Sequence, residues 1–338
     1  MKIIPYILFS ILTFGAIAQK IEFKKELINL KTLKIVKGIS KVNEIHSAGI
    51  GFAGERSDQY DRFEELGKTA TKDELRILTT HPSSAVRGYA FWLLTIKKDK
   101  ETFEILKSTL EDTATVTTFF GCIIDEELLV DFYIDLLTPE FIDNKGIKLT
   151  LTQKQELDSL LLYSNINSYW KSRIISELEP LPKYYERIKE IINEEGTPAA
   201  YVALAKYKKE QDLELLRPLI FDRKLDYYGM QAIREFPSQT LLIDLKAVHD
   251  KEIKKPGGFD YPMIATMYEA IAQFDGETAR ELFQKTINEG HPTALKYHLP
   301  DIVITIGKYP NPAYNDIRSQ IKLSNYQQNE VNSALEKN

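Results

Sequence analysis

The most constraining feature of this sequence is a proline-containing turn that occurs three times, each time directly before an alanine-bearing helical segment. The three copies lie at residues 80–87, 195–204 and 289–295, and their prolines are Pro82, Pro198 and Pro292. An amphipathic, acidic-capped helical pattern precedes each copy. Helix pairs of about 30–45 residues that recur along a chain are typical of helical repeat arrays, because one pair cannot bury its apolar face alone. The repeat therefore predicts helix pairs that stack on their neighbours.

The chain from about residue 41 onward shows the same alternation of helical patterns and breaks. Thr71 is predicted to cap a helix, with Glu74 as its capping-box partner. The segment 115–124 is predicted to begin a further helix, and the loop 254–260 is the longest non-helical signal. We therefore predict an all-α protein, a right-handed α-solenoid of stacked antiparallel helix pairs.

Residues 81–90 read His-Pro-Ser-Ser-Ala-Val-Arg-Gly-Tyr-Ala, and this segment resembles the opening of the second helix in a HEAT repeat, an armadillo-type helical repeat. In that family a turn with Pro or Asp leads into Val-Arg-x-x-Ala, which Val86, Arg87 and Ala90 match. The other two copies lack Val-Arg, so the resemblance is good over residues 71–94 and diffuse elsewhere. It implies a curved, non-catalytic surface that holds other macromolecules. It also implies that Arg87 pairs with carboxylates of the adjacent repeat rather than with a ligand.

The N-terminus is typical of a secretory signal peptide. Lys2 provides a positive charge, the apolar stretch 3–18 follows, and Ala16-Ile-Ala18 forms a small-x-small cleavage site. The apolar stretch is shorter than the ~20 residues that a transmembrane helix needs. We predict cleavage after Ala18 and export to the periplasm or the medium of a bacterium, with an uncleaved N-terminal anchor as the alternative. The predicted organisation is a signal peptide at 1–18, a basic lead-in at 19–40 and a HEAT-like repeat array at 41–338.

Composition limits the chemistry that this chain can carry. The 44 Lys and Arg residues against 49 Asp and Glu give a net charge of -5, which provides no general attraction for nucleic acid. Cys122 is the single cysteine, which excludes an intramolecular disulfide and a cysteine-based zinc cluster, and we expect a buried, inert thiol there. His291 and His298 have no third ligand nearby, which makes a weak metal site. We expect no cofactor, no metal and, after signal cleavage, no integral membrane segment.

Residues 49–54, Gly-Ile-Gly-Phe-Ala-Gly, match the Gly-x-Gly-x-x-Gly pattern of dinucleotide sites. Such a site needs a preceding strand and a following helix within a βαβ unit, and no such pattern surrounds the motif. We therefore expect a loop, or a helix whose small residues permit close packing.

Four aromatic residues are candidates for contact with a partner: Tyr185, Tyr228, Phe259 and Tyr261. The first two belong to Tyr-Tyr pairs whose members cannot both face the core of one helix, so one member of each pair is expected at the surface. The other two belong to the Gly-Gly loop region, and exposed aromatic residues on loops favour contact with proteins or sugars. Packing between helices is the alternative for all four.

The stretch 99–158 contains 14 acidic and five basic residues, and its densest part holds Asp125, Glu126, Glu127 and Asp131. We predict an acidic patch that serves as an electrostatic docking surface for a partner. Solvated helix faces without a binding role are one alternative. A catalytic carboxylate pair about 5–9 Å apart is another, although nothing in the sequence singles out such a pair.

These patterns favour one function and leave two alternatives. None of the nucleophile-elbow, zincin or Walker motifs is present. We therefore expect an exported, non-enzymatic scaffold of the cell envelope that binds a protein partner through a concave helical face. The alternatives are a glycan- or peptide-binding module that uses the same face, and a carboxylate-based hydrolase. The sequence leaves open the partner, the binding face and the oligomeric state.

Overall fold

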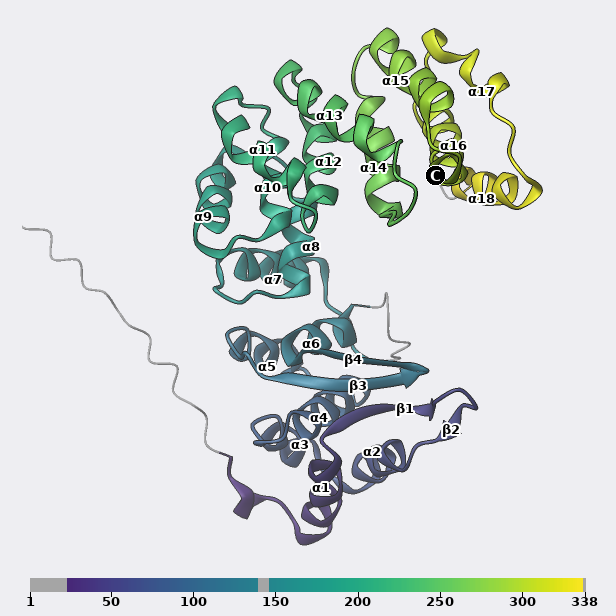
Figure 1. Ribbon diagram of the computed structural model, residues 1–338. Coiled ribbons are helices and arrows are strands. Elements are labelled where there is room, and N and C mark those ends of the chain that lie inside the picture. Colours follow the sequence, from purple (N-terminus) through teal and green to yellow (C-terminus); the bar gives the residue numbers. More distant parts are fainter. Residues whose placement is uncertain (1–22, 139–145, 337–338) are drawn as a thin grey trace, which may run out of the picture. The chain divides into compact units, whose positions relative to one another are not determined.

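A computed structural model of the chain describes residues 23–138 and 146–336 (Figure 1). The described residues are mostly helical, as predicted. None of their helices is long and apolar enough to span a membrane. The predicted signal peptide at 1–18 lies outside the described residues.

The chain forms two compact units, residues 1–154 (unit 1) and 155–338 (unit 2). Unit 1 combines helices with a small sheet. Its helices are α1 (Leu30–Val42), α2 (Asp58–Thr69), α3 (Lys72–Leu78), α4 (Ser84–Ile96), α5 (Thr102–Ser108) and α6 (Leu129–Leu137), and a 3-10 turn precedes them at Lys25–Leu27. Its strands are β1 (Glu44–Ile50), β2 (Glu55–Arg56), β3 (Thr115–Gly121) and β4 (Ile123–Leu128). Helix α1 therefore covers much of the predicted basic lead-in.

The sheet is the main departure from the predicted all-α fold. Its strand order is β2-β1-β3-β4, with β1 and β3 parallel and the other two pairs antiparallel. The helix predicted at 115–124 is wrong, because this segment forms β3 and the start of β4. Its run Thr-Val-Thr-Thr-Phe-Phe is β-branched and aromatic, which favours a strand. The distant β1 then supplies the ladder partner, with His46 opposite Phe119.

Helix α4 holds the core of unit 1 together. Tyr89 lies fully buried on this helix, and its hydroxyl accepts a hydrogen bond from the His46 backbone N–H at 2.8 Å, which ties α4 to β1. Trp92, one turn further along, places its ring 4.7 Å from that of Phe63 on α2. Aromatic pairs at this spacing add to the free energy gained by burial. The sheet and the helices of unit 1 therefore share one aromatic core.

Unit 2 consists of helices that follow one another with short connections. Helix α7 (Leu151–Tyr163) spans the division between the units. The other helices are α8 (Tyr169–Glu177), α9 (Tyr185–Glu195), α10 (Pro198–Ala205), α11 (Leu213–Phe221), α12 (Asp226–Glu235), α13 (Gln239–Glu252), α14 (Tyr261–Ile271), α15 (Gly276–Glu289), α16 (Pro292–Lys308), α17 (Ile317–Gln320) and α18 (Asn325–Glu336). Short 3-10 turns occupy Pro182–Tyr184, Glu210–Asp212 and Pro312–Tyr314.

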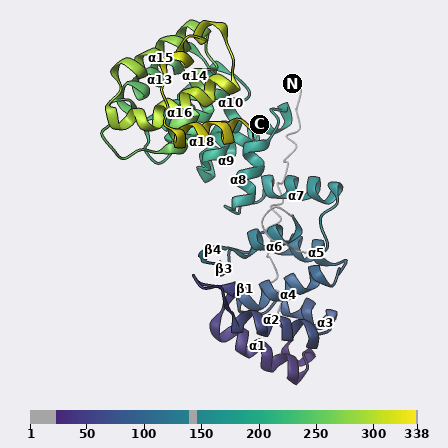
Figure 2. The same ribbon diagram turned by 90° about the vertical axis from the view of Figure 1, so that its right-hand side faces the viewer.

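The helices of unit 2 are packed as pairs against their neighbours. Successive even-numbered helices contact one another from α8 to α18, and both views show α14, α16 and α18 side by side (Figures 1 and 2). Ion pairs join the odd-numbered helices: Arg217 of α11 binds Asp244 of α13 at 2.7 Å, and Arg280 of α15 binds Asp316 beside α17 at 2.9 Å. The same kind of contact thus recurs from one helix pair to the next.

The recurring prolines lie at helix starts. Pro198 and Pro292 are the first residues of α10 and α16, where the N–H that proline lacks has no helical partner to lose. Pro82 precedes Ser83, whose side chain caps α4 by accepting a hydrogen bond from the Val86 N–H. The three turns of the sequence repeat therefore all begin helices.

Candidate functional site

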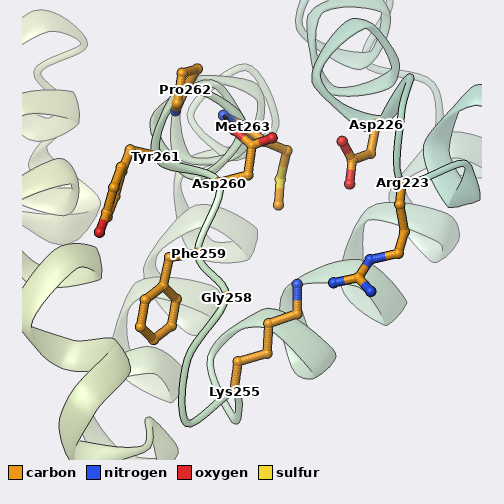
Figure 3. A pocket seen from close by; sticks show the side chains of 9 residues that line it. All are labelled: Arg223, Asp226, Lys255, Gly258, Phe259, Asp260, Tyr261, Pro262 and Met263. Carbon is orange, nitrogen blue, oxygen red and sulfur yellow. Dashed lines mark hydrogen bonds between the residues drawn. The ribbon is translucent and has the colours of Figure 1, made fainter.

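A cavity of about 500 Å³ opens in unit 2 between the starts of α12 and α14 (Figure 3). The turn after α11 supplies Arg223, the first turn of α12 supplies Asp226, and the loop between α13 and α14 supplies most of the remaining wall. That loop contains Gly258 with a φ of +73°, a left-handed conformation that favours glycine. The predicted loop 254–260 is therefore a wall of this cavity.

Charged side chains from opposite walls point into the cavity. Arg223 and Lys255 extend toward one another, with the Asp226 carboxylate above them (Figure 3). Lys255 is paired with the buried Glu252. Arg223 has no ion pair in the described part of the chain. Its guanidinium is therefore available to an acidic group from outside.

The two carboxylates of the cavity have different environments. Asp260 is the N-cap of α14, and its side chain accepts a hydrogen bond from the Met263 N–H at 3.0 Å. Burial, followed by repulsion from Asp260, raises the pKa of Asp226 above its ordinary value. The position of Asp226 therefore favours a proton or a cationic group.

An aromatic cluster adjoins the cavity and contains two of the predicted contact residues. The rings of Phe259 and Tyr261 both lie against Tyr297 of α16, at 4.8 and 5.0 Å between centroids. Tyr261 is 54% exposed and Tyr297 36% exposed, whereas Phe259 is partly buried. The loop thus presents aromatic surface beside charged groups, a combination common at protein interfaces.

The other two predicted contact residues lie elsewhere. Tyr185 is buried in unit 2, and its hydroxyl donates a hydrogen bond to the Asp212 carboxylate at 2.9 Å, so its ring offers little surface to a partner. Tyr228 is partly buried beside Tyr227 and does not line the cavity. Arg223, Asp226 and Lys255 were not predicted, because they come from separate turns that only the packing of α11 to α14 brings together.

The predicted acidic patch is divided between a strand and a helix. Asp125 and Glu126 are exposed on β4, Glu127 is partly buried on the same strand, and Asp131 is buried in α6. Solvated helix faces are therefore the wrong description for this patch. Cys122 lies exposed at the turn between β3 and β4, so the expected burial of its thiol is also wrong.

Glu127 lies in an environment that disfavours its charged form. Burial, followed by repulsion from Asp135 and Asp131, raises its pKa to about 8. The native protein therefore binds a proton at Glu127 near neutral pH, which the unfolded chain does not.

Replacing Glu127 with glutamine should stabilise unit 1 by about 2 kcal/mol at pH 7, after allowance for partial solvent exposure. Because the native pKa lies above the ordinary value, the native carboxyl loses stability as the pH rises from about 4.5 to about 8. The gain from Glu127→Gln should therefore vanish near pH 4. Urea unfolding in a Trp170→Phe background measures it, since Trp92 then reports unit 1 alone.

Glu126→Gln is the matched control for that prediction, because Glu126 is the exposed neighbour on the same strand. It should change the free energy of unfolding by less than about 0.5 kcal/mol. A Glu127→Gln protein no more stable than wild type at pH 8 would contradict the prediction.

A buried polar network lies within unit 2. The Tyr268 hydroxyl lies 2.7 Å from His298 Nδ1 and 3.0 Å from Thr286 Oγ1, and Thr286 Oγ1 lies 2.8 Å from His249 Nε2. Both histidines are fully buried, and burial lowers the pKa of each to about 4. The hydrogen bonds of this network connect four helices, α13 to α16. Sequence spacing gave no indication of this network.

The other sequence candidates have local structural contacts. Arg87 binds the Asp112 carboxylate beyond α5, while Val86 and Ala90 are buried. Gly49 lies in β1 opposite Arg56, Gly51 and Gly54 form the hairpin turn between β1 and β2, and Ser57 caps the helix that follows. In a dinucleotide site the glycine-rich turn leads directly into the helix whose N-terminus binds the phosphate. Here the turn leads into β2 instead, so the motif does not form such a site.

Within residues 23–138 and 146–336, no three His, Cys, Asp or Glu side chains are placed to hold a metal ion together. No family model, curated protein or solved structure matches the chain. The HEAT resemblance over residues 71–94 therefore stays a prediction from the sequence.

Proposed function

We propose that this chain is an exported, non-enzymatic scaffold of the bacterial cell envelope that binds a protein partner. In this proposal the signal peptide at 1–18 is cleaved after Ala18, and the stacked helix pairs form a right-handed, HEAT-like solenoid. The observation that carries the proposal is the open cavity between α12 and α14, which is lined by the available guanidinium of Arg223 and, on the loop that faces it, by the exposed Tyr261.

The composition of the cavity favours a protein partner. Arg223 can form an ion pair with an acidic side chain or a C-terminal carboxylate of a partner, and Asp226 can form one with a basic side chain. Tyr261, which lines the cavity, and Tyr297, which packs against it, offer rigid aromatic area of the kind found at binding hot spots. Neutral sugars would leave Arg223 and Asp226 without a charged counterpart. The partner therefore carries charged groups next to an apolar or aromatic one.

Two variants test the proposal, and each has a matched control. Mature protein, residues 19–338, serves as bait for envelope extract, and retained proteins are identified by mass spectrometry. Arg223→Glu should weaken retention of the partner about tenfold, because it places an acidic group opposite the partner's own. Lys224→Glu is the matched control, because Lys224 is an exposed cation in the same turn that does not line the cavity.

Tyr261→Ala should weaken the same partner, whereas Tyr326→Ala, at a 72% exposed tyrosine of α18, should not. All four substitutions are on exposed side chains and should leave the free energy of unfolding within about 0.5 kcal/mol of wild type. Equal retention by Arg223→Glu and Lys224→Glu proteins would reject the cavity as the binding site.

A glycan-binding module is the second candidate, and the exposed rings of Tyr261 and Tyr297 are the observation that favours it. Retention of the mature protein on a glycan array, abolished by Tyr261→Ala and without any protein partner, would replace the first proposal with this one. The carboxylates of Asp226 and Asp260 would serve a hydrolase only if Asp226→Asn abolished cleavage of the retained glycan.

A further inference from the structure

Among the strands that the structure describes, β4 lies at the edge of the sheet and pairs only with β3. The register places Thr117 opposite Glu126 and Phe119 opposite Ile124, and the Leu129 N–H donates to the Ala114 carbonyl at 2.8 Å. In an antiparallel pair the inward-bonding residues alternate. The backbone N–H and C=O groups of Ile124 and Glu126 therefore point away from β3. No described strand pairs with them.

The side chains of this edge are exposed and carry one sign of charge. Ile123 and Ile124 are 67% and 65% exposed, and Asp125 and Glu126 are also exposed. Neither carboxylate has an ion pair in the described part of the chain. The local contacts of these carboxylates are the Glu126 N–H, which donates to Asp125 Oδ1, and the Thr115 hydroxyl, which donates to Glu126 Oε1. The edge therefore offers a partner both apolar area to bury and carboxylates to pair with.

The pleat of β4 divides these four side chains equally between the two faces of the strand. Successive residues of a strand point to opposite faces, so Ile123 and Asp125 share one face, and Ile124 and Glu126 share the other. Each face of the edge therefore presents one apolar and one acidic side chain. An antiparallel strand that reads two basic residues followed by two apolar residues would match both faces at once.

We propose that residues 123–126 of β4 bind an extended, basic polypeptide segment of a partner by antiparallel strand addition. The backbone groups of Ile124 and Glu126 that point away from β3 supply the hydrogen bonds, with the Glu126 N–H exchanging Asp125 Oδ1 for the partner, and the carboxylates select a lysine- or arginine-bearing strand. A second copy of this chain does not fit, because antiparallel pairing of two β4 edges would bring Asp125 and Glu126 of both copies together. This surface is separate from the cavity of unit 2 and does not depend on it.

A designed peptide tests the proposal directly. The probe is fluorescein-labelled Thr-Lys-Lys-Val-Val-Thr, and its binding to mature protein is followed by fluorescence anisotropy at low ionic strength. In the proposed register the first lysine and the first valine lie opposite Glu126 and Ile124 and donate their N–H groups to the edge. N-methylation of these two residues should weaken binding about tenfold or more.

The matched control is the isomer that is N-methylated at the second lysine and the second valine, whose N–H groups point away from the edge. It should bind as well as the parent peptide. Equal loss with both isomers, or loss with neither, would overturn strand addition. A peptide with glutamate in place of lysine should not bind measurably, and its equal binding would overturn the preference for a basic strand.

Protein variants give an independent readout. Glu126→Pro removes an N–H that points away from β3, so the β3–β4 ladder should persist and peptide binding should fall about tenfold. Glu126→Ala keeps this N–H and should retain more affinity than the proline variant. Equal affinity in the two variants would contradict backbone pairing. Arg223→Glu should leave peptide binding unchanged, so failure of the cavity proposal and failure of this one are distinguishable.

Discussion

Replacing Glu195 with alanine is expected to lower the free energy of unfolding of unit 2 by about 4 kcal/mol. The side chain of Lys171 on α8 is 1% exposed, and its Nζ donates to Glu195 Oε2 at 2.5 Å and to the Ser164 carbonyl at 2.7 Å. Without the carboxylate, the buried ammonium retains only the carbonyl. Removing one member of a buried ion pair costs about 3–5 kcal/mol.

Glu195 also holds a second cation. Arg187 of α9 donates to Glu195 Oε1 at 3.1 Å and to the carbonyls of Leu162 and Ser164 at 3.0 and 3.3 Å. One carboxylate thus connects α8 and α9 to the end of α7, and its loss should disturb all three helices. Urea unfolding of a Trp92→Phe background, in which Trp170 of α8 reports unit 2, measures the change.

The control is Glu177→Ala, which removes an exposed ion pair with Arg173 on the same helix as Lys171. Exposed helical pairs contribute about 0.3–0.5 kcal/mol. The double variant Lys171→Met/Glu195→Leu should recover part of the stability lost in Glu195→Ala, because it removes the unpaired Lys171 charge, while Arg187 keeps Glu190 and two carbonyls but still loses Glu195. An effect of Glu195→Ala as small as that of Glu177→Ala would contradict the prediction.

The helix starts were predictable because their signals are local. Thr71 and Glu74 form the predicted capping box, in which the Glu74 N–H donates to the Thr71 hydroxyl and the Thr71 N–H to the Glu74 carboxylate. Pro198 and Pro292 open their helices for an equally local reason. Such signals act within one turn of helix, so a single sequence contains all the information they need.

The sheet and the cavity depend on contacts between distant parts of the chain. The segment 115–121 becomes a strand in a ladder with β1, and nothing within the segment identifies that partner. Arg223 and Lys255 meet because α11 to α14 pack together, while Phe259 and Tyr261 could be nominated because a Gly-Gly loop precedes them. Tyr185 shows the limit of such nominations, since its hydroxyl binds Asp212, which lies in a different turn.

Acidification is expected to destabilise unit 2 through the buried histidines of its polar network. The native pKa of both His249 and His298, about 4, lies below the ordinary value of 6.5. The unfolded chain therefore binds protons that the native state excludes, and stability is lost as the pH falls through 6.5 toward 4. At pH 5 each histidine should cost about 2 kcal/mol relative to pH 7.

Asp301 of α16 opposes this effect. Burial, followed by repulsion from Glu269, raises the pKa of Asp301 to about 7, so its native carboxyl gains stability as the pH falls from 7 to 5. This gain is about 2 kcal/mol. The wild-type protein should therefore lose only about 2 kcal/mol of unit 2 stability over this range, whereas the Asp301→Asn protein should lose about 4 kcal/mol.

Urea unfolding at pH 7 and pH 5, followed by Trp170 fluorescence in the Trp92→Phe background, separates these contributions. Adding His249→Gln to Asp301→Asn should reduce the loss to about 2 kcal/mol, because the glutamine amide can bond Thr286 without titrating. A flat response of the Asp301→Asn protein between pH 7 and pH 5 would show that the histidines already accept protons in the native state. At His249 the Asp250 carboxylate, which favours the charged imidazole, would then outweigh burial and the neighbouring Lys285 cation, which both lower the pKa, as burial and Lys255 do at His298.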